Sequence, residues 1–245
     1  MKKRFINRLA AFILFAMMGV NLFSQGFYIY TKDGQRQHFP SENVDSIVFY
    51  EKATEDIGSN FINGHEYVDL GLPSGLKWAS CNVGASSPEG YGGYYAWGET
   101  EEKSDYDADT YKWYIRYTGY VNIGSNISGT QYDVAHVKWG GSWRMPTRDE
   151  IIELVNNCTW KWTSYNGVNG QLVTGPNGNS IFLPAAGLHY GTGLDDRGSE
   201  GHYWSATLYE SSGYAYVLYF YRGFSKWNGS WWSRNYGHTV RPVTE

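Results

Sequence analysis

Alternating apolar and polar positions recur along the chain and predict many short strands. The alternation is clear in FYIYT at residues 27–31, where Asp33 and Gly34 follow as a hairpin turn. A second hairpin is predicted across GPNGN, because Pro and Gly supply the turn geometry. Its two strands are expected at residues 171–174 and 180–183. The remaining strands are expected at residues 46–50, 66–70, 76–80, 94–97, 111–117, 203–206, 213–221 and 238–243.

One helix stands out, in RMPTRDEIIELVNNCTW. Thr147 can cap its first turn, and Glu150 three residues later completes a capping box. A wide apolar face follows at residues 151–155, and the two asparagines at 156–157 are expected to end the helix. One helix among many strands predicts an α+β fold, a β-rich domain with few helices.

The first 25 residues have the pattern of a secretory signal peptide. Lysines and arginines precede a twelve-residue apolar run at 9–20, which is shorter than the roughly 20 residues that a membrane-spanning helix needs. Cleavage is expected near Ser24 or Gln25, and an uncleaved anchor is the alternative. The sequence thus predicts a protein that is secreted or held in the cell envelope (periplasm or outer surface), without a transmembrane span after cleavage.

Composition divides the rest of the chain into three parts. Residues 26–50 predict a small β unit, which is too short to bury a core alone. Residues 51–60 are polar and acidic and are expected to form a linker, and residues 61–245 form one domain.

Charge and aromatic content narrow the class of protein. Charged residues and aromatic residues each make up 18% of the chain, which argues against disorder because too much apolar surface would face water. The net charge is −4, so nucleic acid is not an expected partner.

The chain has two cysteines, Cys81 and Cys158. In an oxidising compartment they are predicted to form a disulfide. The alternative is a pair of buried free thiols, because unpaired cysteine often serves as a small core residue.

Several motifs occur in one order along residues 63–243: VDLGLPSGLKWASCNVGA, YYAWGET, WGGSWRMPTRDEIIEL, NGNSIFLPAAG, YWSAT and VRPV. The series resembles the Fibrobacter succinogenes major paralogous domain, which is common in exported proteins of gut Bacteroidetes. That family is similar to the C-type lectin-like fold, which the formylglycine-generating enzyme and the target proteins of diversity-generating retroelements share. The resemblance implies a C-type lectin-like domain in a Bacteroidetes-type surface protein.

The resemblance also implies a role for each part of the domain. The framework would contain Trp139, Gly140, Trp143, Arg144, Pro146, Trp204, Val240, Arg241, Pro242 and Val243. In retroelement targets with this fold, the stretch before the last strand is displayed as a ligand-binding surface. That stretch maps onto residues 222–236 of this chain.

Composition singles out the same stretch. Ten aromatics lie between Tyr214 and Tyr236, and no carboxylate lies between Ser211 and Thr244. GYAYVLYFY has few polar atoms and predicts a core strand. RGFSKWNGSWWSRNYG mixes aromatic anchors with small polar and cationic residues, as antibody paratopes do. The alternative is that these aromatics are also core residues.

We therefore predict a non-catalytic binding protein that recognises a glycan or a protein surface, with no cofactor. Aromatic faces would stack on the ligand, and Arg and Lys would orient it. A structural subunit of a cell-surface assembly is the alternative. The predicted contact residues are Tyr221, Arg222, Phe224, Lys226, Trp227, Asn228, Trp231, Trp232, Arg234, Asn235 and Tyr236.

Catalytic signals are weak. The oxidase chemistry of the formylglycine-generating enzyme needs two cysteines late in the domain, and none follows Cys158. The six histidines lack the spacing of metal ligands, and His238 is interpreted as a surface or hydrogen-bonded histidine. The sequence alone does not exclude a glycosidase-like pair among the carboxylates Glu99, Asp195, Asp196 and Glu200.

An acidic stretch is the last candidate for chemistry. Asp105, Asp107 and Asp109 are spaced like the start of an EF-hand loop. Thr110 replaces the required glycine, and Arg116 stands where a bidentate glutamate is needed. We therefore interpret the stretch as a solvated acidic loop and expect no metal.

Overall fold

The computed structural model describes residues 27–30, 36–39, 60–223 and 231–245. The chain divides into two compact units, Met1–Glu55 and Asp56–Glu245. In the first unit, β1 (Phe27–Tyr30) pairs antiparallel with β2 (Arg36–Phe39), which confirms the predicted hairpin. The expected signal peptide, the strand at 46–50 and residues 51–59 of the expected linker lie outside the described residues.

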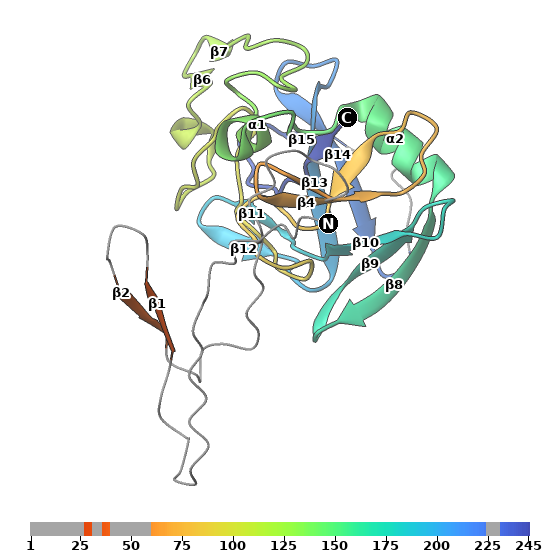
Figure 1. The fold of residues 1–245 in the computed structure, drawn as a ribbon. Coiled ribbons are helices and arrows are strands. Elements are labelled where there is room, and N and C mark those ends of the chain that lie inside the picture. Colours follow the sequence, from red (N-terminus) through yellow and green to blue (C-terminus); the bar gives the residue numbers. More distant parts are fainter. Residues whose placement is uncertain (1–26, 31–35, 40–59, 224–230) are drawn as a thin grey trace, which may run out of the picture. The chain divides into compact units, whose positions relative to one another are not determined.

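The second unit is β-rich with few helices, as predicted (Figure 1). Its helices are α1 (Val134–Trp139), α2 (Arg148–Asn157) and the short 3-10 helix η2 (Ala108–Thr110). Its strands are β3 (Phe61–Ile62), β4 (His65–Asp69), β5 (Lys77–Ala79), β6 (Tyr114–Ile115), β7 (Gly119–Tyr120), β8 (Thr159–Tyr165), β9 (Val168–Thr174), β10 (Ser180–Pro184), β11 (Leu188–Tyr190), β12 (Gly193–Asp195), β13 (Glu200–Leu208), β14 (Tyr214–Tyr221), β15 (Trp231–Ser233) and β16 (Val243–Thr244). Among the described residues, no helix has the length and apolarity needed to cross a membrane.

The strands form several small antiparallel sheets. The orders are β16-β5-β4-β3, β10-β9-β8 and β13-β14-β15, with two-stranded pairs β6-β7 and β11-β12. Figure 1 shows the β8–β10 sheet and the β6–β7 pair at opposite sides of the unit. Strand β16 pairs with β5, with Val243 opposite Trp78, so the end of the unit is bonded to a segment near its beginning.

Helix α2 begins with the predicted capping box. The Thr147 hydroxyl accepts from the backbone N–H of Glu150 at 3.3 Å, and the Glu150 carboxylate accepts from the N–H of Thr147 at 2.7 Å. Arg144 also donates to both oxygens of that carboxylate, at 2.6 and 2.9 Å. The box is therefore fixed to a residue of the predicted framework.

The GPNGN hairpin is also confirmed, because β9 and β10 pair with Thr174 opposite Ser180. Several elements of the second unit were not predicted: α1, β8, the short helix η2 and the short strands β3, β7, β11, β12 and β15. Helix α1 has only six residues, which is too short for a periodic pattern to register. Strand β8 directly follows α2, and its mixture of exposed and half-buried positions gives no clean alternation. Residues 94–97, predicted as a strand, contain one isolated bridge, between Tyr95 and His238.

Most of the predicted framework residues lie in the core, whereas Gly140 and Arg144 are half-buried. The side chains of Trp143 and Trp204 are 0% and 1% exposed. The guanidinium of Arg241 is buried as well and donates to neutral acceptors only, the side chain of Asn82 and the carbonyls of Ala79, Ser80 and Phe182, at 2.8 to 3.0 Å. Burial lowers the pKa of Arg241 from its ordinary value because it penalises the charged form.

The expected disulfide is not formed. Cys81 and Cys158 are both free and pack with different hydrophobic clusters. Cys158 is the residue that ends α2, beside Leu154 and Val155. The Sγ of Cys81 instead donates to the carbonyl of Ala85 at 3.4 Å. Burial raises the pKa of Cys158 to about 11, so its thiol is protonated at neutral pH.

We predict that Thr147→Ala lowers the free energy of unfolding by about 1 kcal/mol, because the N–H of Glu150 loses its acceptor. Thr147→Ser keeps the hydroxyl and should stay within about 0.5 kcal/mol of the original protein. Urea unfolding monitored by tryptophan fluorescence measures both. Equal stability of the Ala and Ser variants would contradict the capping assignment.

Candidate functional site

A cleft of about 360 Å³ opens beside β15, and most of its wall is aromatic. We call it the aromatic cleft. Its described lining residues come from five separate parts of the unit: η2, β7, β11, β14 and the segment that begins with β15. They are Asp107, Ala108, Tyr120, Tyr190, Tyr214, Trp231, Trp232, Ser233, Asn235 and Tyr236.

Backbone pairing brings these distant segments together. In the β14–β15 ladder, Tyr214 lies opposite Ser233. His189 and Gly237 exchange two backbone hydrogen bonds of 2.8 and 2.9 Å, which places the end of β11 against the turn after β15. The rings of Tyr190 and Tyr236 consequently approach to 4.8 Å between centroids.

The turn after β15 is also fixed to the loop that contains Asp107. The side-chain amide of Asn235 donates to the carbonyl of Tyr106 at 2.6 Å. Asn235 accepts in turn from the hydroxyl of Ser233. Asn235 is only 4% exposed, so its main role at the cleft is to hold one wall against another.

Several cleft rings remain open to solvent. Tyr190, Tyr214 and Trp231 are 52%, 41% and 47% exposed. They account for three of the eight large hydrophobic side chains that are exposed among the described residues. Isolated exposed aromatics are ordinary, but several around one cavity mark a site where a partner can bury them.

Arg234 was predicted to contact the ligand, and the structure contradicts that role because the side chain is 1% exposed. Its guanidinium donates to the hydroxyl of Tyr111 at 3.0 Å and to the carbonyls of Ser212 and Val121 at 2.9 and 3.3 Å. It also lies over the rings of Trp97 and Tyr120, at 4.8 and 5.4 Å from their centroids. Arg234 therefore supports the cleft from behind.

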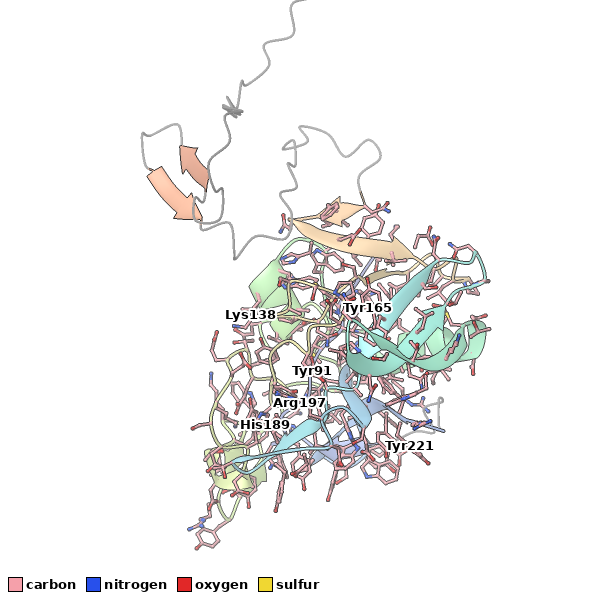
Figure 2. All side chains as sticks on the ribbon, turned by 90° about the horizontal axis from the view of Figure 1, so that it is seen from below. Tyr91, Lys138, Tyr165, His189, Arg197 and Tyr221 are labelled. Atoms are coloured by element: carbon pink, nitrogen blue, oxygen red, sulfur yellow. The ribbon has the colours of Figure 1, made fainter. Side chains whose placement is uncertain are left out.

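The other predicted contact residues fall into three groups. Trp231, Trp232, Asn235 and Tyr236 line the cleft. Tyr221 and Arg222 are exposed, but they lie at the far end of β14, roughly 20 Å from Tyr214 by strand geometry. Figure 2 likewise shows Tyr221 well apart from His189, the neighbour of Tyr190. Phe224, Lys226, Trp227 and Asn228 lie outside the described residues.

Besides the small residues Ala108 and Ser233, sequence reasoning missed four lining residues with charged or aromatic side chains: Asp107, Tyr120, Tyr190 and Tyr214. Tyr214 was assigned to the core strand, and its exposure follows from its place at the start of β14. The other three lie 40 or more positions before β15 along the chain. No local pattern connects them to the terminal segment.

A buried polar array lies behind the cleft wall. His238 was expected at the surface or hydrogen-bonded, but it is 0% exposed, and neither ring nitrogen has a hydrogen-bond partner among the described residues. Its ring stacks on that of His202 at 5.3 Å and lies 5.9 Å from that of Trp232. Nε2 of His202 lies 3.0 Å from the Glu200 carboxylate. Burial and the nearby His202 hold the pKa of His238 well below its usual range.

Two of the four acidic candidates, Glu99 and Glu200, are engaged within the chain. Glu99 lines a second cavity of about 450 Å³ and accepts from the ammonium of Lys103 and the N–H of Lys112. Glu200 accepts from the hydroxyl of Tyr219 at 3.0 Å, besides its contact with His202. No group of three or more His, Cys, Asp or Glu among the residues with assigned structure is placed to hold a metal ion.

In the acidic loop, Arg116 pairs with Asp109 at 2.7 Å. The residue that occupies the calcium-ligand position of an EF-hand therefore neutralises one of the three aspartates. Asp107 of the same loop instead lines the aromatic cleft.

A family model described as a domain of unknown function (DUF8237) matches residues 159–243. The match runs from β8 to the first residue of β16 and includes the cleft residues of β11, β14 and β15. No curated protein and no solved structure matches the chain.

We predict that Arg234→Met lowers the free energy of unfolding by about 3 kcal/mol, because acceptors in three loops lose the donor that the buried guanidinium supplies. Arg222→Met, at an exposed position of the same segment, should change it by less than about 0.5 kcal/mol. Urea denaturation measures both. A destabilisation of similar size in the two variants would show that Arg234 is not the support described above.

The burial of His238 also predicts a pH dependence. Its folded-state pKa is depressed, so below about pH 6.5 the unfolded chain binds a proton that the folded protein does not. The contribution of neutral His238 to the free energy of unfolding is fully present above that pH. It falls as pH decreases, by up to about 1.4 kcal/mol per pH unit. In His238→Phe, which keeps a packed ring, the slope of unfolding free energy between pH 7 and 5 should be smaller. An unchanged slope would refute the assignment.

Proposed function

We propose that this is an exported, non-catalytic binding protein that recognises a glycan or a protein surface through the aromatic cleft. The observation that carries the proposal is the convergence of three exposed aromatic side chains, Tyr190, Tyr214 and Trp231, on one cavity. Aromatic residues bury a large area at a low cost in conformational entropy, so they dominate binding hot spots. A partner that covers these rings removes apolar surface from water at a gain of about 25 cal/mol per Å².

The scaffold supports the same proposal. We infer that the second unit is a C-type lectin-like domain, as its resemblance to the major paralogous domain implies. In support, most of the motif residues assigned to the framework are buried, and the terminal strand β16 is bonded to β5. The segment before that terminal strand supplies one wall of the cleft, as ligand-binding stretches do in the retroelement targets.

The chemistry of the proposed surface differs from the sequence-based expectation. Arginine and lysine were expected to orient the ligand, but Arg234 is buried and Arg222 lies away from the cleft, while Lys226 lies outside the described residues. Among the described lining residues, the formal charge comes from Asp107. Recognition in the cleft therefore rests on aromatic area, tyrosine hydroxyls and one carboxylate.

A structural subunit of a cell-surface assembly is the second candidate. The exposed rings of Tyr190, Tyr214 and Trp231 would then be covered permanently by another subunit. Obligate interfaces are larger and more apolar than those of transient complexes. A stable oligomer in purified protein that dissociates on mutation of these rings would favour this candidate.

The first test is a binding screen against a glycan array and mucosal surface extracts. We predict that Tyr190→Ala combined with Trp231→Ala weakens binding at least about tenfold, because an aromatic hot-spot residue contributes 2 kcal/mol or more. Tyr165→Ala is the matched control: its side chain is 46% exposed but does not line the cleft.

Melting temperatures of all variants would accompany the screen. Loss of binding in the double variant, with folding retained and the control unaffected, would support the cleft as the recognition site. Equal binding by the double variant and the original protein would contradict the proposal.

A further inference from the structure

The aromatic cleft combines many rings with one negative charge. Its described lining includes four tyrosines and two tryptophans, and Asp107 is the one residue with a formal charge. Asp107 is exposed and forms no ion pair with any described residue, whereas Asp109 in the same loop is paired with Arg116. A carboxylate at the edge of several ring faces is the arrangement that attracts a cation, because both the charge and the ring quadrupoles are negative toward it.

The protein already holds one cation in this manner. Behind the cleft, the guanidinium of Arg234 lies over the rings of Trp97, Tyr111 and Tyr120 at 4.8 to 5.5 Å. Among the described residues, its hydrogen bonds go to a hydroxyl and to carbonyls, not to a carboxylate. Rings and neutral oxygen acceptors together therefore accommodate a buried positive charge in this part of the fold. The same charge opposes a second cation nearby, so a cationic ligand in the cleft needs the carboxylate of Asp107.

The polar atoms of the cleft favour a cation that carries N–H groups. Lone pairs are supplied by the Asp107 carboxylate, the side-chain carbonyl of Asn235 and the hydroxyl oxygens of Ser233 and Tyr120, which lie 3.5 Å apart. A lysine ammonium has three donors and an arginine guanidinium has five, so each can use several of these acceptors. A quaternary ammonium has no N–H donor and cannot use these acceptors.

We propose that the aromatic cleft receives a lysine or arginine side chain presented by a partner protein. The proposal rests on the function proposed above and assigns the class of ligand within it. The net charge of −4 favours encounter with a basic partner. The cleft volume of about 360 Å³ is at the low end for ligand sites, as suits one inserted side chain.

The test uses the tripeptides acetyl-Gly-Lys-Gly-amide and acetyl-Gly-Arg-Gly-amide, with a norleucine tripeptide as the neutral counterpart of nearly the same shape. Binding is followed by NMR through the tryptophan indole N–H signals. We expect at least one basic tripeptide to bind about tenfold more tightly than the norleucine tripeptide, the factor that corresponds to a desolvated cation–π contact with a nearby carboxylate. Equal affinity of the basic and neutral peptides would overturn the proposal.

A pair of charge variants tests the role of the carboxylate. Asp107→Asn should weaken binding of the basic tripeptide about fivefold or more, as expected when a partly desolvated charge contact is lost. Asp109→Asn changes the net charge equally but removes a carboxylate that is paired with Arg116 and lies outside the cleft, so its effect should stay below about twofold. Similar effects of the two variants would indicate general electrostatic attraction and refute a specific site.

Two further probes distinguish other occupants. Choline tests a quaternary cation, and glucosamine tests an amino sugar that carries the same ammonium chemistry as lysine. Tighter binding of either than of both basic peptides would overturn the assignment to a partner protein. If cleft variants abolish binding to surface extracts while Asp107→Asn leaves it unchanged, the proposed function stands and the cationic assignment fails.

Discussion

The cleft depends on a buried arginine, Arg234, whose hydrogen bonds to the described residues all go to neutral acceptors. Arg234 connects the loop before β14, the segment after β7 and the hydroxyl of Tyr111 through its side chain, and its carbonyl accepts from the N–H of Trp97 at 2.9 Å. Taking a charge out of water is costly, and here several neutral acceptors and ring faces offset that cost together. Because each acceptor lies on a different loop, the guanidinium fixes the positions of loops that have little regular structure of their own.

The terminal segment contains a second buried arginine that is bonded to neutral acceptors. Arg241 is buried against Asn82 and three backbone carbonyls, so the last residues of the chain are fixed to the loop after β5 and to β10. Between the two arginines, the segment passes through the core as Gly237, His238 and Thr239, which form isolated bridges to three other parts of the unit. The absence of carboxylates from this stretch suggested a cationic surface. In the structure, Arg234 and Arg241 are instead buried, and they contact carbonyls, other neutral acceptors and aromatic rings.

The inner wall of the cleft is packed against the core, and its outer side is open to solvent. Trp232 and Tyr236 contact the buried histidines on one side and line the cleft on the other. Their positions are consequently set by packing before any ligand arrives, which lowers the entropy cost of binding. Tyr190, Tyr214 and Trp231 complete the opening with rings that solvent still reaches. Preorganised inner rings and accessible outer rings together form a surface suited to recognition.

The sequence by itself determined several local elements and the place of one wall of the aromatic cleft. The capping box of Thr147 and Glu150 and the GPNGN hairpin involve residues a few positions apart, so short-range chemistry was sufficient to predict them. The aromatic composition of residues 214–236 likewise indicated one wall of the cleft.

Only the tertiary structure decided which polar side chains face the aromatic cleft. Arg234 and Arg222 have the same chemistry in one segment, yet one is buried under rings and the other is exposed. Asp107 and Tyr190 enter the cleft through backbone pairing between distant loops, which no local pattern encodes. Burial depends on what the rest of the chain places over a residue, so the sign of the charge in the cleft could not be inferred from the segment that forms its wall.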